Sequence, residues 1–424
     1  MKVCIVGAGA SGITVAKSLH ERGVAFDWFE KGSALGGLWR YGNDSGTSSA
    51  YRSLQIDTSS RGLAFPDFAV PRHWPDYLGA DRVLDYLESY AREFGVHGTV
   101  QTSTEVTSVR PVAGRWQVTT DRHGLQEYDA VVVANGHLTR PRTPAFRGSF
   151  TGQQLHSHTY RTSEAFRGKV VVIVGMGNSG CDIAVDLARV AEQVYLSTRR
   201  SAWVLPKYVL GVPTDRWTAL LTRRLRLPTP VARNVVKALA RASLGRQERF
   251  GIPTPRHSIH REHATIGQEL LPYVAYEWIR IKPDVAELAG NQVRFTDGTT
   301  VTAEVLLCAT GYDPDFPFLP DQLVATAESG GRLYRRILHP DAPGLLFAGL
   351  VQPVGPTIPL VAVQGRWIAR VLTGDITPPP REQMEHEIAE HRRWVAASFV
   401  GSERYRLEVD FRRYAGQLQS DMAG

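Results

Sequence analysis

Length and composition set the first limits on this chain of 424 residues. With 43% hydrophobic and 21% charged residues, it is long enough for two or three domains with hydrophobic cores, and its composition is not that of a disordered protein. The net charge of +7 is spread along the chain without a recognition motif, so we expect no nucleic-acid partner. The three cysteines form no CxxC pair and no metal-ligand spacing, which argues against a dithiol reductase and predicts no metal site.

The start of the chain, MKVCIVGAGA, enters a β-rich run at once and leaves no room for a signal peptide. No uninterrupted apolar run reaches the roughly 18 residues that a membrane span needs. We therefore expect a cytoplasmic protein without a transmembrane anchor.

The first glycine-rich turn, GAGASG, follows this β-rich run and opens a helix. Gly7 permits the turn, Gly9 lets the backbone approach a pyrophosphate, and Gly12 allows the helix to pack on the strand. The next strand, Phe26 to Phe29, ends at Glu30, where a carboxylate accepts hydrogen bonds from ribose hydroxyls and disfavours a ribose 2′-phosphate. The first site is therefore predicted to take FAD or NAD, and spacing alone leaves the choice between them open.

A second glycine-rich turn, GMGNSG, follows an apolar run at 169–174. Gly175, Gly177 and Gly180 repeat the spacing of the first turn and precede a predicted helix that runs through Ala188. Two such turns in one chain predict two bound dinucleotides.

The strand after the second turn, Val194 to Leu196, has no acidic residue at its end and continues as Ser197-Thr-Arg-Arg200. A guanidinium suits the 2′-phosphate that separates NADP from NAD, so Arg199 and Arg200 predict a preference for NADPH. Ser197 could add a hydroxyl contact. The alternative is a solvated basic strand end without a ligand.

The stretch FTGQQLHSHTY lies between the two turns and fits the pattern F-x-G-x-x-x-H-x-x-x-Y, with Phe150, Gly152, His156 and Tyr160 in register. It resembles the identifying motif of the flavin-containing monooxygenase (FMO) family, the class B flavoprotein monooxygenases, in their soluble bacterial form. The resemblance implies FAD at the first turn, NADPH at the second, and molecular oxygen as electron acceptor through a flavin hydroperoxide.

Further segments take their predicted roles from this resemblance. A similar GGLW segment, here Gly36 to Trp39, lies against FAD in the family, and Gln352 and Thr357 are expected beside the isoalloxazine. His156 is expected to position NADPH, with Ser157 and Tyr160 lining the same region, while a hydrogen-bonded structural histidine is the alternative for His156.

One residue departs from the family pattern. Where many members carry Asn before Thr/Ser-Ser, this chain has Asp57, followed by Thr58. A neutral amide can donate a hydrogen bond to a flavin peroxide, whereas an ionised carboxylate would repel it. Three interpretations stay open: burial holds Asp57 protonated, the side chain faces elsewhere, or the oxygen chemistry is altered. A turn Asp that caps its own backbone is the structural alternative.

The predicted catalytic residues are Asp57 and Gln352. The predicted cofactor-binding residues are Gly7, Gly9, Ser11, Gly12, Glu30, Lys31, Gly37, Leu38, Trp39, Thr58, His156, Ser157, Tyr160, Gly175, Gly177, Asn178, Ser179, Gly180, Ser197, Arg199, Arg200, Gln352 and Thr357.

The expected fold class is α/β with two Rossmann-like dinucleotide-binding domains. The FAD domain is predicted to comprise 1–150 and 286–424, and the inserted NADPH domain 151–285, with a helical insert at about 213–250. Within the insert, the basic stretch 220–249 is interpreted as a solvated face, with an anionic membrane surface as the alternative.

The expected activity is NADPH-dependent oxygenation of a soft nucleophile, an amine nitrogen or a sulfide, in a small-molecule substrate. Baeyer-Villiger oxygenation of a ketone is an alternative, although Tyr160 stands where those enzymes more often have Trp. An uncoupled NADPH oxidase or a redox-responsive flavoprotein that does not turn over is another. A homodimer is one open option for the assembly.

Overall fold

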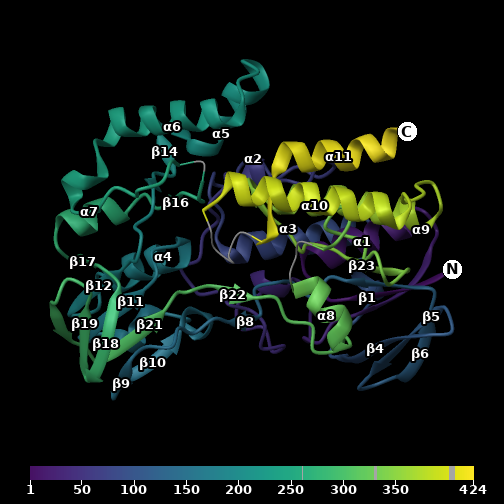
Figure 1. The fold of residues 1–424 in the computed structure, drawn as a ribbon, viewed down its shortest axis with the longest axis horizontal. Helices are drawn as coiled ribbons and strands as arrows, with labels where there is room; N and C mark the ends of the chain where they lie inside the picture. Colours follow the sequence, from purple (N-terminus) through teal and green to yellow (C-terminus); the bar gives the residue numbers. More distant parts are fainter. Residues whose placement is uncertain (260, 329–331, 401–405) are drawn as a thin grey trace. The chain divides into compact units, whose positions relative to one another are not determined.

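The computed structural model describes residues 1–259, 261–328, 332–400 and 406–424 (Figure 1). The chain divides into two compact units. Unit 1 comprises Met1–Ser48, Ser60–Arg140 and Tyr312–Gly424, and unit 2 comprises Ser49–Ser59 and Pro141–Gly311. In the described part of the chain, none of the helices has the length and apolar character of a membrane-spanning segment.

Unit 1 is built on a five-stranded parallel sheet with strand order β23-β7-β1-β2-β3. Its central strands are short apolar runs because both faces of the sheet are covered. The strands are β1 (Lys2–Val6), β2 (Ala25–Phe29), β3 (Val100–Gln101), β7 (Ala130–Val133) and β23 (Leu345–Phe347).

Helices pack around this sheet in unit 1. The glycine-rich turn leads into α1 (Ala10–His20), which packs against α9 (Ile358–Leu372), and α11 (Phe411–Ala423) lies along α9 (Figure 1). The amphipathic helix α3 (Ala80–Glu93) begins after its N-cap, Gly79, which makes no side-chain cap hydrogen bond. The other elements of unit 1 are η1 (Gly37–Trp39), α2 (Ser60–Leu63), η2 (His97–Thr99), β4 (Val106–Val112), β5 (Arg115–Thr120), β6 (Gly124–Tyr128), β22 (Tyr312–Asp313), α8 (Asp321–Glu328), β24 (Gln352–Val354), α10 (Arg381–Ser398) and β25 (Glu408–Asp410).

Unit 2 has its own five-stranded parallel sheet, with strand order β10-β21-β11-β12-β17. The second glycine-rich turn joins β11 to α4 (Asn178–Leu187), as β1 is joined to α1 in unit 1. The strands are β10 (Gln153–His156), β11 (Val170–Val174), β12 (Gln193–Ser197), β17 (Ile279–Lys282) and β21 (Val305–Cys308). These two sheets confirm the predicted α/β class with two Rossmann-like domains.

A second, four-stranded sheet of unit 2 has the order β20-β19-β18-β9. It contains a hairpin that turns around Asp297-Gly298 and is formed by β19 (Gln292–Phe295) and β20 (Thr300–Thr302). Its other strands are β9 (Gly148–Phe150) and β18 (Val285–Gly290). Because β18 to β21 complete the sheets of unit 2, this unit extends to Gly311, beyond the boundary predicted at 285.

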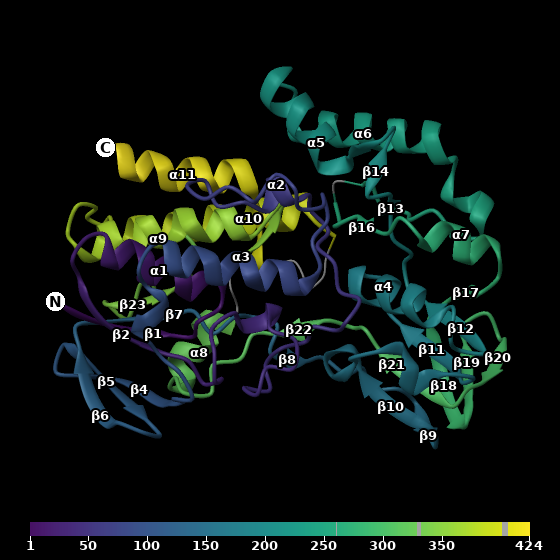
Figure 2. The ribbon, with the colours of Figure 1, turned by 180° about the vertical axis from the view of Figure 1, so that it is seen from behind.

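The helical insert of unit 2 stands apart from the parallel sheet of that unit (Figure 2). It contains α5 (Thr214–Ala219), the π-helical turn η5 (Leu220–Arg224), α6 (Thr229–Leu244) and the 3₁₀ turn η6 (Gln247–Phe250). The remaining short elements are β8 (Arg140–Pro141), η3 (Ser157–Thr159), η4 (Ser163–Phe166), β13 (Val204–Leu205), β14 (Tyr208–Val209), β15 (Val212–Pro213), β16 (Thr265–Ile266) and α7 (Leu270–Ala275).

The packing of α9 on α1 depends on Gly365, because a Cβ at this position would lie 2.6 Å from the carbonyl oxygen of Thr14. We predict that Gly365→Ala forces the helices apart and lowers the free energy of unfolding by about 1–3 kcal/mol. The measurement is the midpoint of thermal unfolding. Gly416→Ala is the matched control: it also lies within a helix, but no atom lies near its Cβ position, so it should raise stability by about 0.5–1 kcal/mol. An unchanged midpoint for Gly365→Ala would contradict this interpretation.

Candidate dinucleotide sites

The first glycine-rich turn of unit 1 leaves no room for a side chain at Gly7 or Gly12. Gly7 has a φ of +100°, and a Cβ there would lie 2.7 Å from the carbonyl oxygen of Ala134. At Gly12 a Cβ would lie 2.0 Å from the carbonyl oxygen of Gly7. The indole nitrogen of Trp28 donates a hydrogen bond to that same carbonyl, at 2.9 Å. The turn therefore offers bare backbone at the N-terminus of α1, which suits the pyrophosphate of a dinucleotide.

Glu30 lies at the end of β2 and is buried. Its Oε2 accepts a hydrogen bond from the backbone N–H of Ala8 at 2.7 Å, and its Oε1 accepts one from Gly32 at 2.8 Å. Burial raises the pKa of Glu30, while these two N–H donors oppose the shift. Each carboxyl oxygen keeps a second lone pair, so Glu30 can hold the turn and still accept a ribose hydroxyl.

The GGLW segment lies against the first turn. It forms η1, and a Cβ on Gly37 would lie 2.9 Å from the Cα of Gly9. Leu38 and Trp39 complete η1 and are partly buried. Lys31, by contrast, is exposed and forms an ion pair with Glu105 at 2.9 Å, so its ammonium already has a partner on the surface of unit 1.

A second set of contacts at this end of unit 1 surrounds Gly349. A Cβ on Gly349 would lie 2.1 Å from the hydroxyl oxygen of Ser11, and its N–H donates to Gln364 Oε1 at 2.8 Å. Gln364 is not among the predicted site residues, although a glutamine within the apolar run that opens α9, Ile358 to Gln364, is a signal. Gln352 begins β24, and Thr357 is the exposed N-cap of α9.

The second glycine-rich turn repeats the geometry of the first. Gly175 has a φ of +112°, and a Cβ there would lie 2.4 Å from the carbonyl oxygen of Ala309. At Gly180 a Cβ would lie 1.9 Å from the carbonyl oxygen of Gly175. Gly177 is the N-cap of α4, and Asn178 and Ser179 are its first residues. Unit 2 therefore also presents backbone N–H groups and a helix N-terminus where an anionic group can bind.

The residues at the end of β12 have different surroundings. Ser197 is fully buried, and its hydroxyl donates to the carbonyl oxygen of Pro283 at 2.7 Å, so this side chain secures the strand end inside unit 2. Arg199 and Arg200 are exposed. The guanidinium of Arg200 lies 3.6 Å from Glu262 Oε1. Among the described residues, Arg199 forms no ion pair, so its guanidinium is available to a phosphate.

The Phe150 to Tyr160 motif contains the edge strand β10, which pairs with β21. A Cβ on Gly152 would lie 2.5 Å from the carbonyl oxygen of Glu304, so glycine permits this pairing. His156 ends β10 in register with Cys308, which pairs in turn with Val174, so His156 lies in the same row as the residue before the second glycine-rich turn. Burial lowers the pKa of His156, and a hydrogen bond with the backbone of Gly311 opposes the shift.

Ser157 and Tyr160, predicted to line the same region, are both buried. The hydroxyl of Tyr160 donates to Asp186 Oδ2 at 2.5 Å, and its ring meets that of Tyr51 edge-on at a centroid distance of 5.6 Å. The side chain of Tyr160 is therefore engaged in packing within unit 2.

Asp57 belongs to unit 2, in the segment Ser49–Ser59, which joins that unit although the chain on both sides of it belongs to unit 1. Asn178, in the second glycine-rich turn, donates to Asp57 Oδ2 at 2.5 Å. Thr58 follows in the same bend. Among the three interpretations of Asp57, these contacts favour a side chain turned to the nucleotide turn of unit 2.

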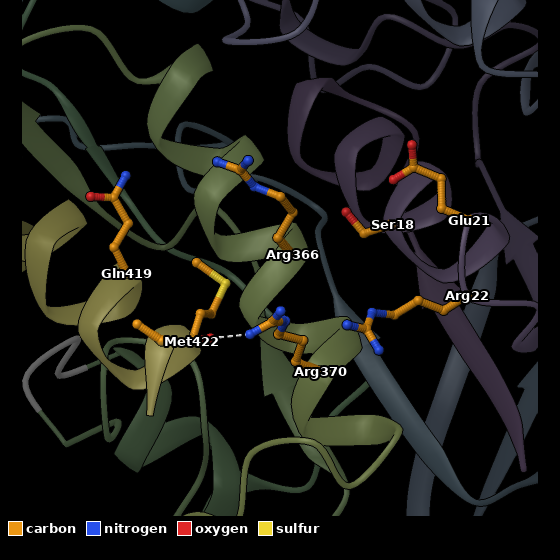
Figure 3. Close-up of a pocket in the computed structure, with 8 residues that line it drawn as sticks. Ser18, Glu21, Arg22, Arg366, Arg370, Gln419 and Met422 are labelled. Atoms are coloured by element: carbon orange, nitrogen blue, oxygen red, sulfur yellow. Dashed lines mark hydrogen bonds between the residues drawn. The ribbon is translucent and has the colours of Figure 1, made fainter.

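A surface hollow of about 480 Å³ lies elsewhere in unit 1 (Figure 3). Ser18, Glu21 and Arg22 line it from the C-terminal end of α1, and Arg366 and Arg370 from the second half of α9. Dinucleotides bind at the carboxyl ends of parallel strands, where α1 begins. The hollow is thus at the opposite end of α1 from the glycine-rich turn.

Known proteins of one family are similar to this chain over nearly its whole length. A family model described as FMO-like, flavin-binding monooxygenase-like, matches residues 1–423. Flavin-containing monooxygenase 5 of Cavia porcellus is 34% identical over 433 residues, which cover 97% of this chain and 80% of that protein. Flavin-containing monooxygenase 3 of Homo sapiens is 32% identical over 447 residues, covering 99% of this chain and 82% of that protein.

Among solved structures, S-allyl-L-cysteine S-oxygenase from Allium sativum is similar to this chain, with a TM-score of 0.75 and 28% identity; the match covers 100% of this chain and 88% of that one. Both the sequence matches and this structural match extend over nearly all of the chain. The chain therefore belongs to the flavin-binding monooxygenase-like family, which confirms the resemblance, and is a flavin-dependent monooxygenase.

Proposed function

We propose that the protein is an NADPH-dependent flavoprotein monooxygenase that oxygenates an amine nitrogen or a sulfide, with FAD held by unit 1 and NADPH by unit 2. The observation that carries the assignment of cofactors is the contrast between two otherwise equal turns. The strand after the first turn ends in the buried acid Glu30, whereas the strand after the second ends in the exposed Arg199 and Arg200. An acid favours an unsubstituted ribose, and a guanidinium favours a 2′-phosphate.

The residues of unit 1 fit FAD. Gly7 and Gly12 leave the backbone free to approach a pyrophosphate, and η1 places Gly37 against Gly9. Glu30 would accept a ribose hydroxyl. The N-terminus of α9, with Thr357 as its N-cap and Gln352 upstream, would face the anionic edge of the isoalloxazine.

The residues of unit 2 fit NADPH. Gly175 and Gly180 form the same bare turn, and Asn178 begins the helix that would receive the pyrophosphate. Arg199 would bind the 2′-phosphate. His156, in the same strand-end row, would orient the nicotinamide half.

When bound, the flavin accepts hydride from NADPH and activates molecular oxygen for transfer to the substrate. The chain's own residues bind and orient the two dinucleotides and exclude water, because unproductive release of reduced oxygen wastes NADPH. The similar Allium sativum protein is an S-allyl-L-cysteine S-oxygenase, which supports a sulfide as one substrate class. We further propose a cytoplasmic location and a homodimer as the assembly.

Glu30→Gln should weaken retention of FAD. The glutamine amide has an NH₂ group in place of one carboxylate oxygen. This donor would face the N–H donor of either Ala8 or Gly32, so one of these two hydrogen bonds is lost. We expect FAD affinity to fall about tenfold or more, measured by fluorescence titration of the deflavinated protein. Glu105→Gln removes a nearby acid that contacts Lys31, and it should leave FAD affinity unchanged. Equal affinities for both variants would contradict the assigned role of Glu30.

Arg199→Ala should reduce the preference for NADPH over NADH. Loss of a charge-assisted contact with the 2′-phosphate is expected to raise KM for NADPH by about ten- to a hundredfold while leaving KM for NADH nearly constant. Steady-state assays with both nucleotides measure this ratio. Arg280→Ala, which removes an exposed arginine from the neighbouring β17, is the charge-matched control. A parallel loss with both nucleotides would argue against 2′-phosphate recognition.

Product analysis tests the proposed reaction. The FAD-loaded protein is supplied with NADPH, oxygen and either a dialkyl sulfide, a tertiary amine or a cyclic ketone. We expect sulfoxide or N-oxide formation in step with NADPH consumption. Ester formation from the ketone alone would replace this proposal with Baeyer-Villiger oxygenation, and NADPH consumption with hydrogen peroxide as the sole product would indicate an oxidase.

A further inference from the structure

Both the nitrogen and the oxygen of the Asn178 side-chain amide form hydrogen bonds. Its Nδ2 donates to Asp57 Oδ2 at 2.5 Å, and its Oδ1 accepts the backbone N–H of Ile266 at 3.1 Å. Next to this contact, the hydroxyl of Thr265 donates to the carbonyl oxygen of Met176 at 3.0 Å. The second glycine-rich turn is thus anchored to β16 by two hydrogen bonds between a side chain and the backbone, and to Asp57 by a hydrogen bond between side chains.

The segment that carries Asp57 is attached to unit 2 along its length. Tyr51 donates to Asp182 Oδ2 at 3.1 Å, and Ser53 donates to Asp186 Oδ2 at 2.8 Å, both on α4. Ser59 donates to Asp215 Oδ2 at 2.7 Å. These contacts fix the position of Asp57 next to α4 independently of its own hydrogen bond.

The carboxyl group of Asp57 lies in surroundings that disfavour a negative charge. Its Oδ1 is enclosed and has no hydrogen-bond partner among the described residues. Burial, with Asp182 as a second cause, raises the pKa of Asp57 to about 7, and Lys207 opposes the shift. Burial also raises the pKa of Asp182. The titratable groups that face this pair are Tyr51, Cys181, Asp186, Lys207 and Glu269.

We propose that Asp57 is a positioning residue that links NADP(H) binding to the uptake of one proton, acting through Asn178 on the second glycine-rich turn. The inference rests on the proposed binding of NADP(H) by unit 2. The proton comes from solvent and resides on Oδ1, while Oδ2 continues to accept the hydrogen bond from Asn178.

The physical reason is the charge of the ligand. A dinucleotide at this turn brings its pyrophosphate to the N-terminus of α4, where Asn178 is the first residue. An ionised Asp57 on the side chain of Asn178 would repel that charge, whereas a neutral Asp57 would not. Binding therefore favours the protonated form, and affinity should fall by about tenfold per pH unit once free Asp57 ionises.

The test is calorimetric titration of NADP⁺ into the FAD-loaded protein, from about pH 6 to about pH 8.5, in buffers of different ionisation enthalpy. For the wild type we expect proton uptake approaching about one per NADP⁺ near pH 8, where the 2′-phosphate of the ligand is already ionised. Asp57→Asn keeps an acceptor for Asn178 but cannot take up the proton. Its affinity should show no such decline above about pH 7, and its uptake near pH 8 should be close to zero.

Asp215→Asn is the matched control, because Asp215 also contacts the Ser49–Ser59 segment and also has one enclosed oxygen without a hydrogen-bond partner among the described residues. The Asp215→Asn variant should bind NADP⁺ with the same pH dependence and the same proton uptake as the wild type. Equal proton uptake by wild type and Asp57→Asn would overturn the inference while leaving the NADPH assignment intact. Absence of NADP⁺ binding at every pH would instead overturn the proposed function, and the inference with it.

A second readout needs no nucleotide. The folded chain keeps the Asp57 proton to a higher pH than the unfolded chain, so this group lowers stability as pH rises from about 4 to about 7. The Asp57→Asn variant lacks this ionisable group, so its stability should not show this decrease with pH. The thermal midpoint of Asp57→Asn relative to wild type should therefore be higher at about pH 8 than at about pH 5, and a difference independent of pH would contradict a neutral Asp57.

Discussion

The rest of this structure depends on close backbone–backbone packing at two glycine-rich turns, where no side chain separates the chain segments. In each unit, the first glycine lies against the carbonyl of a strand-end alanine, Ala134 or Ala309. The third glycine lies against the carbonyl of the first. A single Cβ would separate the helix from its sheet at any of these places. Because the first N–H groups of an α-helix have no partner within the helix, the same packing that closes each unit also creates a site for an anion.

Side chains around the turns decide what each site can recognise. In unit 1, the buried Glu30 uses both oxygens to hold the turn, so the group that would meet a ribose is part of the support for the loop. In unit 2, the corresponding strand ends in the buried Ser197, followed by exposed arginines. Hydrogen bonds with Thr265, Ile266 and Asp57 hold the turn in place. The two turns thus share one backbone geometry, but the nearby side chains are acidic in unit 1 and basic in unit 2.

Much of this arrangement could be predicted from the sequence, because glycine spacing and short valine-rich strands are local signals. The glycine turns, Glu30, the strand-end arginines and the hairpin at Asp297-Gly298 are of this kind. The partners of Asp57 and of Tyr160 could not be predicted, since Asn178 and Asp186 are far from them in the chain. The end of unit 2 could not be predicted, because β18 pairs with β9, and β21 pairs with β10 and β11, strands more than a hundred residues earlier in the chain. No local pattern marks such pairing.

Anaerobic mixing of the FAD-loaded protein with stoichiometric NADPH tests the central claim most directly, because it asks whether one chain binds both dinucleotides and passes hydride between them. Absorbance of the oxidised flavin is followed, with NADH as the comparison. The structure predicts that NADPH removes this absorbance much faster than NADH does, and that oxygen restores it. Flavin that stays oxidised in the presence of NADPH would contradict the account.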